Sequence, residues 1–121
     1  MNWGKYFKES EFKCSHCGVA QMDQAFIDRL NELREECGFA FRVSSGYRCP
    51  DHPIEARKTT SGAHTTGKAA DIAVEGRQAH ELLKQAMEMN FKGIGVQQKG
   101  AGRFIHLDDW TAPNRPTVWS Y

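Results

Sequence analysis

Two histidines and an aspartate are the residues of this chain best suited to chemistry. His64 and Asp71 lie in the stretch Ser61-Gly-Ala-His64-Thr-Thr-Gly-Lys-Ala-Ala-Asp71, and His106 follows in Arg103-Phe-Ile-His106-Leu-Asp108. Two imidazoles and one carboxylate are a standard ligand set for a zinc ion that keeps a fourth position open for water. If the three side chains converge, the sequence predicts a hydrolase.

The alternation of side chains along a strand supports this convergence. Asp71 lies on the face opposite its apolar neighbours, and His106 does the same in a later strand. If the two strands are neighbours, Asp71 and His106 meet across them, and His64 arrives from a loop in which Gly67 lets the backbone turn. Chance is the competing explanation, because five histidines in 121 residues readily produce such a spacing.

Hydrophobic periodicity indicates the elements that must position these residues. Residues 22–37 and 77–90 have the pattern of amphipathic helices, and Gly38 is suited to end the first. Residues 47–68 are rich in Gly, Pro, Ser, Thr and charge, which is typical of an ordered functional loop. The expected strands are 39–43, 69–74, 91–96, 103–108 and, as an edge, 117–119. This order predicts an α+β fold, a small antiparallel sheet flanked by two main helices.

The bulk properties indicate one domain, residues 1–121, without an electrostatic partner. Charged residues make up 26% of the chain and the formal net charge is +1, so we expect neither nucleic acid nor a membrane surface as partner. No apolar stretch approaches the roughly 20 residues of a spanning helix. The N-terminus lacks the apolar core of a signal peptide, so we expect a monomer made in the cytoplasm.

The four cysteines leave three interpretations open. Cys14 and Cys17 form a C-x-x-C pair, which in a cytosolic protein suggests a metal or redox role. Together with Cys37 and Cys49 they could hold a second zinc or form a disulfide, although the later two are too widely spaced for an ordinary zinc ribbon. Simple buried thiols are the third interpretation.

Four motifs, in order along nearly the whole chain, resemble the zinc D-alanyl-D-alanine carboxypeptidase family. They are Ser44-Ser-Gly-Tyr-Arg48, Ser61-x-x-His64-x-x-Gly67-x-Ala69-x-Asp71, Gly93-Ile-Gly-Val96 and Phe104-Ile-His-Leu-Asp108, and the opening Tyr6–Phe12 is also similar to short phage and bacterial members. The family includes phage endolysins that cut L-alanyl-D-glutamate bonds, and it shares its fold with the Hedgehog signalling domain. The resemblance therefore implies a Hedgehog/DD-peptidase-like fold.

The resemblance also implies a site and a substrate. It assigns the zinc to His64, Asp71 and His106, and it makes Arg48 the partner of a substrate carboxylate, for which a planar guanidinium is well shaped. Ser61 would hydrogen-bond the same carboxylate or the scissile region. The implied reaction is hydrolysis of a peptidoglycan peptide bond that involves D-amino acids, in the cell wall or periplasm. Either a D-Ala-D-Ala terminus or an internal L-Ala-D-Glu bond fits.

The chain departs from the family at the general base. Many members carry an acid three residues before the last histidine, where this chain has Arg103. An arginine cannot act as a base near neutral pH, so Asp108, Asp109 or Glu55 would have to serve; Asp108, on the strand face of His106, could instead orient a ligand. The alternatives are a non-catalytic, zinc-stabilised module that binds cell wall or serves in a phage particle, and a structural zinc protein organised around Cys14 and Cys17.

Overall fold

The chain folds around a mixed β-sheet. A computed structural model describes residues 1–58 and 62–121. Its strands are β1 (Val43–Ser45), β2 (Ala69–Ile72), β3 (Gly93–Gln97), β4 (Phe104–Asp108) and β5 (Thr117–Ser120). Its α-helices are α1 (Gln24–Cys37), α2 (Pro53–Ala56) and α3 (Gly76–Glu88), and η1 (Glu9–Phe12) and η2 (Ala63–Thr66) are 3-10 helices.

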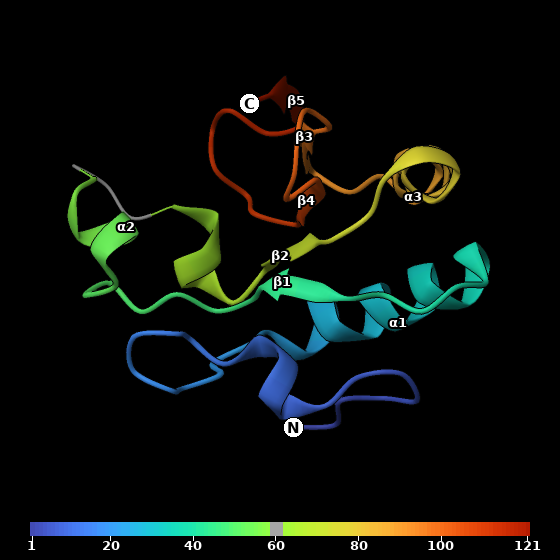
Figure 1. Ribbon diagram of the computed structural model, residues 1–121. Coiled ribbons are helices and arrows are strands. Elements are labelled where there is room, and N and C mark those ends of the chain that lie inside the picture. Colours follow the sequence, from blue (N-terminus) through green and yellow to red (C-terminus); the bar gives the residue numbers. More distant parts are fainter. Residues whose placement is uncertain (59–61) are drawn as a thin grey trace.

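The sheet has the strand order β1-β2-β4-β3-β5 (Figure 1). The pairs β1–β2, β2–β4 and β4–β3 are antiparallel, but β5 runs parallel to β3. The predicted purely antiparallel sheet is therefore wrong in its last pairing. The reason is geometric: β4 ends beside the start of β3, where Asp108 pairs with Gly93, and β2 already occupies the other edge of β4. A chain that returns beside Gly93 at Thr117 must then run in the direction of β3.

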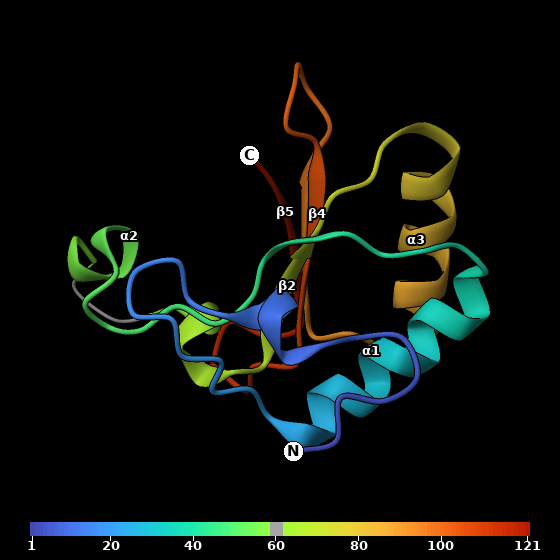
Figure 2. The ribbon, with the colours of Figure 1, turned by 60° about the horizontal axis from the view of Figure 1, so that its bottom comes forward.

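The two long helices, α1 and α3, lie together on one side of the sheet in both views of the ribbon (Figures 1 and 2). Asp23 caps α1 by accepting a hydrogen bond from the Phe26 amide, and Gly38 ends it in the left-handed conformation (φ 75°), as predicted. The hydrophobic core lies between these helices and the strands, and its fully buried members include Ile27, Leu30, Leu33, Ile72, Leu82, Ile105 and Leu107. The prediction of two main helices is confirmed.

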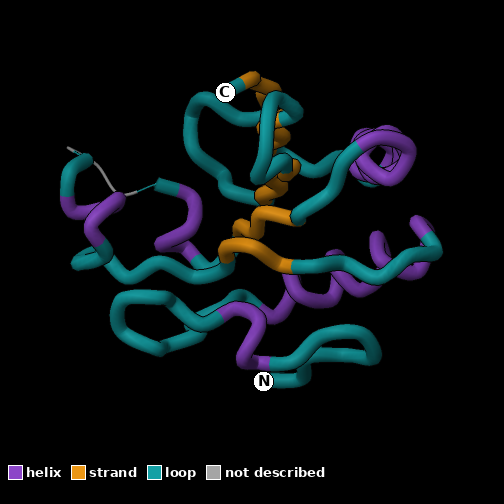
Figure 3. Tube along the Cα trace, in the orientation of Figure 1, coloured by secondary structure: helices purple, strands orange, loops and turns teal. Residues whose placement is uncertain are grey.

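The loop between β1 and β2 lies on the other side of the sheet and contains the short helices α2 and η2, which Figure 3 shows within a long stretch of irregular chain. The first strand is shorter than predicted. Phe39 and Phe41 pack against the core rather than extending the ladder, and β1 begins only at Val43. None of the helices within the described ranges is long and apolar enough to cross a bilayer.

Candidate metal centre

Asp71 and His106 face each other in the centre of the sheet. They are direct partners in the β2–β4 register, and Asp71 Oδ1 lies 3.0 Å from His106 Nδ1 and 3.3 Å from His64 Nε2. One ligand atom from each of the three residues lies within 4.8 Å of the others, and all three side chains are buried. The structure thus brings together the three residues that the sequence singled out.

The loop before β2 holds His64 in place. His64 lies in η2, which ends at Gly67 in the left-handed conformation (φ 76°), so the chain can turn there into β2. The Nδ1 atom of His64 lies 2.7 Å from the carbonyl oxygen of Gly46, to which it donates, and the backbone amide of Arg48 donates to the His64 carbonyl. This contact assigns the proton to Nδ1 and leaves Nε2 directed at Asp71.

The outer nitrogen of His106 is also occupied. Its Nε2 donates to Asp108 Oδ2 at 2.6 Å, and the carboxylate of Asp108 is fully buried. Arg115 binds that carboxylate with two nitrogens, at 2.9 and 3.1 Å, and the Trp110 amide donates to it as well. A histidine whose outer N–H is fixed by an acceptor presents its other nitrogen to a metal, and both histidines of this site have that arrangement.

Glycines in β3 make room for the site. Across the sheet, one row of paired residues runs Asp71, His106, Gly95, Trp119. A Cβ atom at Gly95 would lie 2.6 Å from Trp119 Nε1, so the missing side chain lets Trp119 lean over the strand to within 5.1 Å of the His106 ring. Two rows further along the sheet, where Gly93 pairs with Asp108, a Cβ atom at Gly93 would lie within 2.5 Å of the Asp108 carboxylate.

The electrostatics of the site favour a bound cation. Burial opposes ionisation of Asp71, but the imidazoles of His106 and His64 beside it outweigh burial and hold the pKa of Asp71 well below its usual range. Burial likewise lowers the pKa of His106, while the hydrogen bonds to Asp108 and Asp71 raise it above its ordinary value. Because carboxylate and imidazole groups bind a metal in their deprotonated forms, binding of a metal at this site would release protons.

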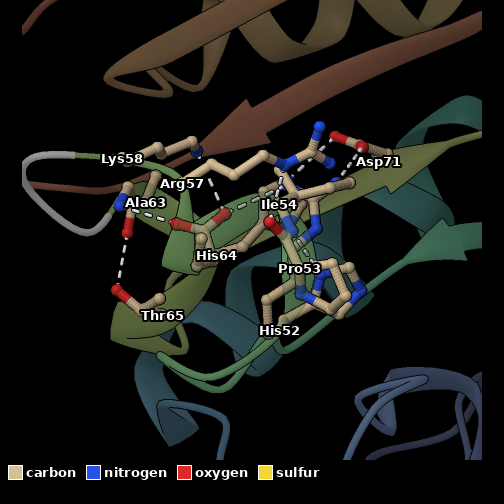
Figure 4. Close-up of polar contacts among 12 residues, drawn as sticks. His52, Pro53, Ile54, Arg57, Lys58, Ala63, His64, Thr65 and Asp71 are labelled. Carbon is tan, nitrogen blue, oxygen red and sulfur yellow. Dashed lines mark hydrogen bonds and ion pairs between the residues drawn. The ribbon is translucent and has the colours of Figure 1, made fainter.

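The site opens into a pocket of about 680 Å³. Its wall includes three cationic residues, Arg48, Lys58 and Arg115. Besides the two histidines it has four aromatic residues, which are Phe104, Trp110, Trp119 and Tyr121. Arg48 lies against two carboxylates, with Nη1 3.3 Å from Glu55 Oε2 and Nη2 3.9 Å from Asp71 Oδ2. Lys58, His64 and Asp71 all line this pocket, and Figure 4 shows them within one cluster of polar side chains. The pocket can therefore receive an anionic group beside the three-residue centre.

The other acids and Arg103 lie outside this opening. Arg103 donates to the Gly100 carbonyl, lies 3.8 Å from Glu75 and faces a separate hollow. Asp109 is paired with Arg29, and Glu55 is buried behind Arg48. Among the described residues that line the pocket, Asp71 is the sole carboxylate. Ser61, predicted to bind substrate, lies outside the described residues.

Sequence reasoning missed two residues that shape the site, Arg115 and Trp119. Arg115 stacks between the rings of Trp110 and Trp119, 5.2 and 5.0 Å from their centroids. Their positions depend on the parallel return of β5, which the sequence did not indicate. The sequence offered one signal, the glycines at alternate positions of one strand, Gly93 and Gly95. Two glycines on one face of a strand indicate that a neighbouring group packs closely against that face.

The donor set fits a divalent metal such as zinc: three protein ligands with an open side facing the pocket is the arrangement of a catalytic zinc site. The second cluster of potential ligands in the described residues, formed by Cys14, Cys17 and Cys49, is a separate group of thiols.

Comparison with known proteins agrees with this site. The family described as Peptidase M15 matches residues 5–108. Peptidoglycan L,D-endopeptidase MepK of Escherichia coli (strain K12) is 31% identical over 104 residues, which cover 80% of this chain and 55% of that protein, and MepK of Shigella flexneri gives the same values. The chain thus spans about half the length of these curated relatives. Because the match extends from residue 5 to the end of β4 and so includes His64, Asp71 and His106, the chain belongs to the Peptidase M15 family.

Proposed function

We propose that the chain is a zinc-dependent peptidase that hydrolyses a peptide bond of peptidoglycan involving a D-amino acid, in the cell wall or periplasm. The observation that carries the proposal is the convergence of His64, Asp71 and His106 at the inner end of a cationic pocket. The similarity to relatives named as peptidoglycan L,D-endopeptidases supports the substrate class and favours an internal L,D bond over a D-Ala-D-Ala terminus.

His64 Nε2, Asp71 Oδ1 and His106 Nδ1 would hold the metal. A bound zinc ion supplies Lewis acidity towards the scissile carbonyl and lowers the pKa of a bound water to about 7. The Gly46 carbonyl accepts from His64 Nδ1, and Asp108 accepts from His106 Nε2. These contacts fix the orientation of the two imidazoles, so the ligands need little rearrangement when a substrate enters.

Arg48 and Lys58 would bind the carboxylate of the substrate. The Arg48 side chain is 17% exposed and that of Lys58 is 41% exposed, and both contact Glu55. Glu55 is therefore shared between two cations, which leaves net positive charge at this wall of the pocket. A free carboxylate on a D-amino-acid residue would be attracted there and would place the neighbouring amide near the metal ligands.

Asp108 fits the role of a positioning residue better than that of the general base. It is fully buried, and His106, Arg115 and the Trp110 amide occupy its oxygens. These contacts keep the pKa of Asp108 below its ordinary value although burial alone would raise it. A base must reach the attacking water, whereas Asp108 reaches His106 instead.

A non-catalytic module that binds cell-wall peptide is the second candidate. It is favoured by Arg103 at the place of the usual acid and by the lack of a second carboxylate among the described residues of the pocket wall. Such a module would still use Arg48 and the metal site to bind peptide.

Digestion of purified muropeptides separates the two candidates. Zinc-loaded protein is incubated with muropeptides that carry both L-Ala-D-Glu and D-Ala-D-Ala bonds, and the products are identified by mass spectrometry. We expect a single type of bond to be cut by the wild type and by Cys37→Ser, whose altered residue lies on α1, but not by His64→Ala. Peptide binding without any cleavage would contradict the peptidase and support the binding module.

A further inference from the structure

Three of the four thiols meet on the side of the molecule formed by the N-terminal segment and the loop after β1. The Sγ atoms of Cys14, Cys17 and Cys49 lie within 4.8 Å of one another, and those of Cys14 and Cys49 are 3.7 Å apart. All four cysteines are free thiols, and Cys37, on α1, is not part of this group. Residues 35 positions apart in the sequence are thus brought together as potential soft-metal ligands.

The local backbone presents these sulfurs to one point. Cys14 and Cys17 lie on a tight turn in which Gly18 N–H donates to the Cys14 carbonyl and Cys14 N–H donates to the Val19 carbonyl, both at 2.8 Å. Gly18 has φ 75°, a conformation that glycine adopts without strain. The amide of Cys49 donates to Cys14 Sγ at 3.3 Å, and an N–H directed at sulfur stabilises the negative charge of a thiolate.

The separations fit a metal better than a disulfide. Ligands at Zn–S distances of 2.3 Å in a tetrahedron are about 3.8 Å apart, close to the 3.7 Å between Cys14 and Cys49, whereas bonded sulfurs are about 2.05 Å apart. A zinc-bound sulfur and imidazole nitrogen would be about 3.5 Å apart, and His16 Nδ1 lies 3.5 Å from Cys49 Sγ. His52 stands in C-x-x-H spacing from Cys49, and its ring centroid lies 6.4 Å from that of His16, while its Nε2 lies 3.0 Å from Ser15 Oγ.

The geometry points to a second, structural zinc site whose ligands are the thiolates of Cys14, Cys17 and Cys49, closed by an imidazole from His16 or His52. Three thiolates and one imidazole are a usual set for structural zinc, and such sites leave no position open for substrate. This site is separate from the three-residue centre and does not depend on the proposed peptidase activity.

The site has a consequence for the pocket. The zinc would join the N-terminal turn to the segment that contains Arg48, the residue directly before Cys49. Arg48 N–H donates to the carbonyl of His64, so the same short segment contacts both clusters. The second zinc would therefore fix the position of Arg48, which would bind substrate, relative to the loop that contains His64.

Zinc counting on reduced protein tests the inference. Protein purified with a phosphine reductant is analysed by mass spectrometry for metal content, and we expect about two zinc ions per chain in the wild type and about one in Cys17→Ser. Cys17 is exposed, so this substitution should leave the core intact. Cys37→Ser is the matched control and should keep both ions. His64→Ala should keep the thiolate-bound ion, which distinguishes failure of this site from failure of the other.

Cobalt gives a second measurement that does not depend on activity. Cobalt-loaded His64→Ala should show thiolate-to-cobalt charge-transfer absorption, and Cys17→Ser should lack it. The double variant His16→Ala/His52→Ala should bind zinc more weakly than the wild type, with the single variants identifying the ligand. An unchanged zinc count in Cys17→Ser would overturn the site, as would a Cys14–Cys49 disulfide in natively purified protein. Unchanged affinity in the double histidine variant would overturn the fourth ligand.

Discussion

At the scale of residues, the candidate centre depends on what lies behind its ligands. His106 faces inward because Asp108 binds its outer nitrogen, and Asp108 can be ionised while fully buried because Arg115 pairs with it at two points. Asp71, His64 and His106 were predictable from their types and from strand alternation. Arg115 was not, because its contact arises from a loop that folds back onto the strand and leaves no periodic pattern.

Replacing Arg115 should show how much the ligands depend on this support. In Arg115→Met a buried carboxylate loses its partner, which costs about 3–5 kcal/mol of unfolding free energy, and zinc affinity should fall by about 10- to 100-fold. Urea denaturation and competition with a fluorescent chelator measure the two effects. Arg103→Met is the control, since its ion pair with Glu75 is exposed and worth about 1 kcal/mol or less. Equal effects in the two variants would refute the role of Arg115.

At the scale of elements, strand β3 contributes to the site through two glycines, because neighbouring side chains occupy the space that a side chain at either position would need. Gly93 lies against Asp108, which Arg115 and His106 hold in place, while Gly95 lies against Trp119 on the edge strand β5. A methyl group added at either glycine needs space. Trp119, on an edge strand, can move aside more easily than the buried Asp108–Arg115 ion pair.

Alanine substitutions in β3 should therefore differ. Gly93→Ala should cost about 1–3 kcal/mol of stability and lower zinc affinity, whereas Gly95→Ala should affect zinc affinity less, because its first contact is the indole. Thermal unfolding and zinc titration of the two variants provide the comparison. The ranking is wrong if Gly95→Ala loses the more zinc affinity.

The loop 47–68 has its own buried acid, Glu55. Its carboxylate accepts from the Gly62 amide, Lys58 and Arg48 at 2.8, 3.0 and 3.3 Å. Burial raises the pKa of Glu55, but the Gly62 and Lys58 hydrogen bonds outweigh this and lower it below the ordinary value. A carboxyl whose pKa is depressed by folding adds stability above its unfolded pKa of about 4.3 and loses that contribution as the pH falls through its folded pKa.

Glu55→Gln should therefore be destabilised most at neutral pH. The difference in unfolding free energy from the wild type should stay nearly constant from about pH 7 to about pH 5. It should shrink as the pH falls below the unfolded pKa of about 4.3 and through the lower, folded pKa, where the wild-type contribution disappears. Urea denaturation of chelator-treated protein at several pH values measures this difference. Glu36→Gln, an exposed change on α1, controls for the loss of one charge, and a difference independent of pH would argue against the role of Glu55.

At the scale of the whole molecule, the sequence predicted the α+β class and both long helices, and it showed that Asp71 and His106 would meet if their strands were neighbours, as they are. These depend on local periodicity and on alternation, which a sequence displays directly. It did not predict the parallel β5, because the direction of an edge strand is decided by where the preceding loop returns. The meeting of Cys14 and Cys17 with Cys49 was equally hidden, since it depends on how the N-terminal segment packs beside the loop after β1.

Metal binding should stabilise the whole fold, because the ligands come from distant parts of the chain. At a free zinc concentration of about 100 times Kd, one site adds about 2.7 kcal/mol, which for a chain of this size raises Tm by roughly 10 °C. The rise should be smaller in His64→Ala and absent in His64→Ala/Cys17→Ser, and magnesium should produce none in the wild type. Scanning calorimetry measures the shift. A zinc response retained in the double variant would contradict both assignments.

The position of Trp119 also gives the protein an optical reporter. Because Gly95 has no side chain, the indole lies 5.1 Å from the ring of His106 and 5.0 Å from the Arg115 guanidinium. Indole emission is sensitive to nearby charge, and a paramagnetic ion quenches it at short range. The arrival of cobalt or zinc at His106 can therefore be followed in real time through intrinsic fluorescence, without a label, and Trp119→Phe identifies the share of the signal that comes from this ring.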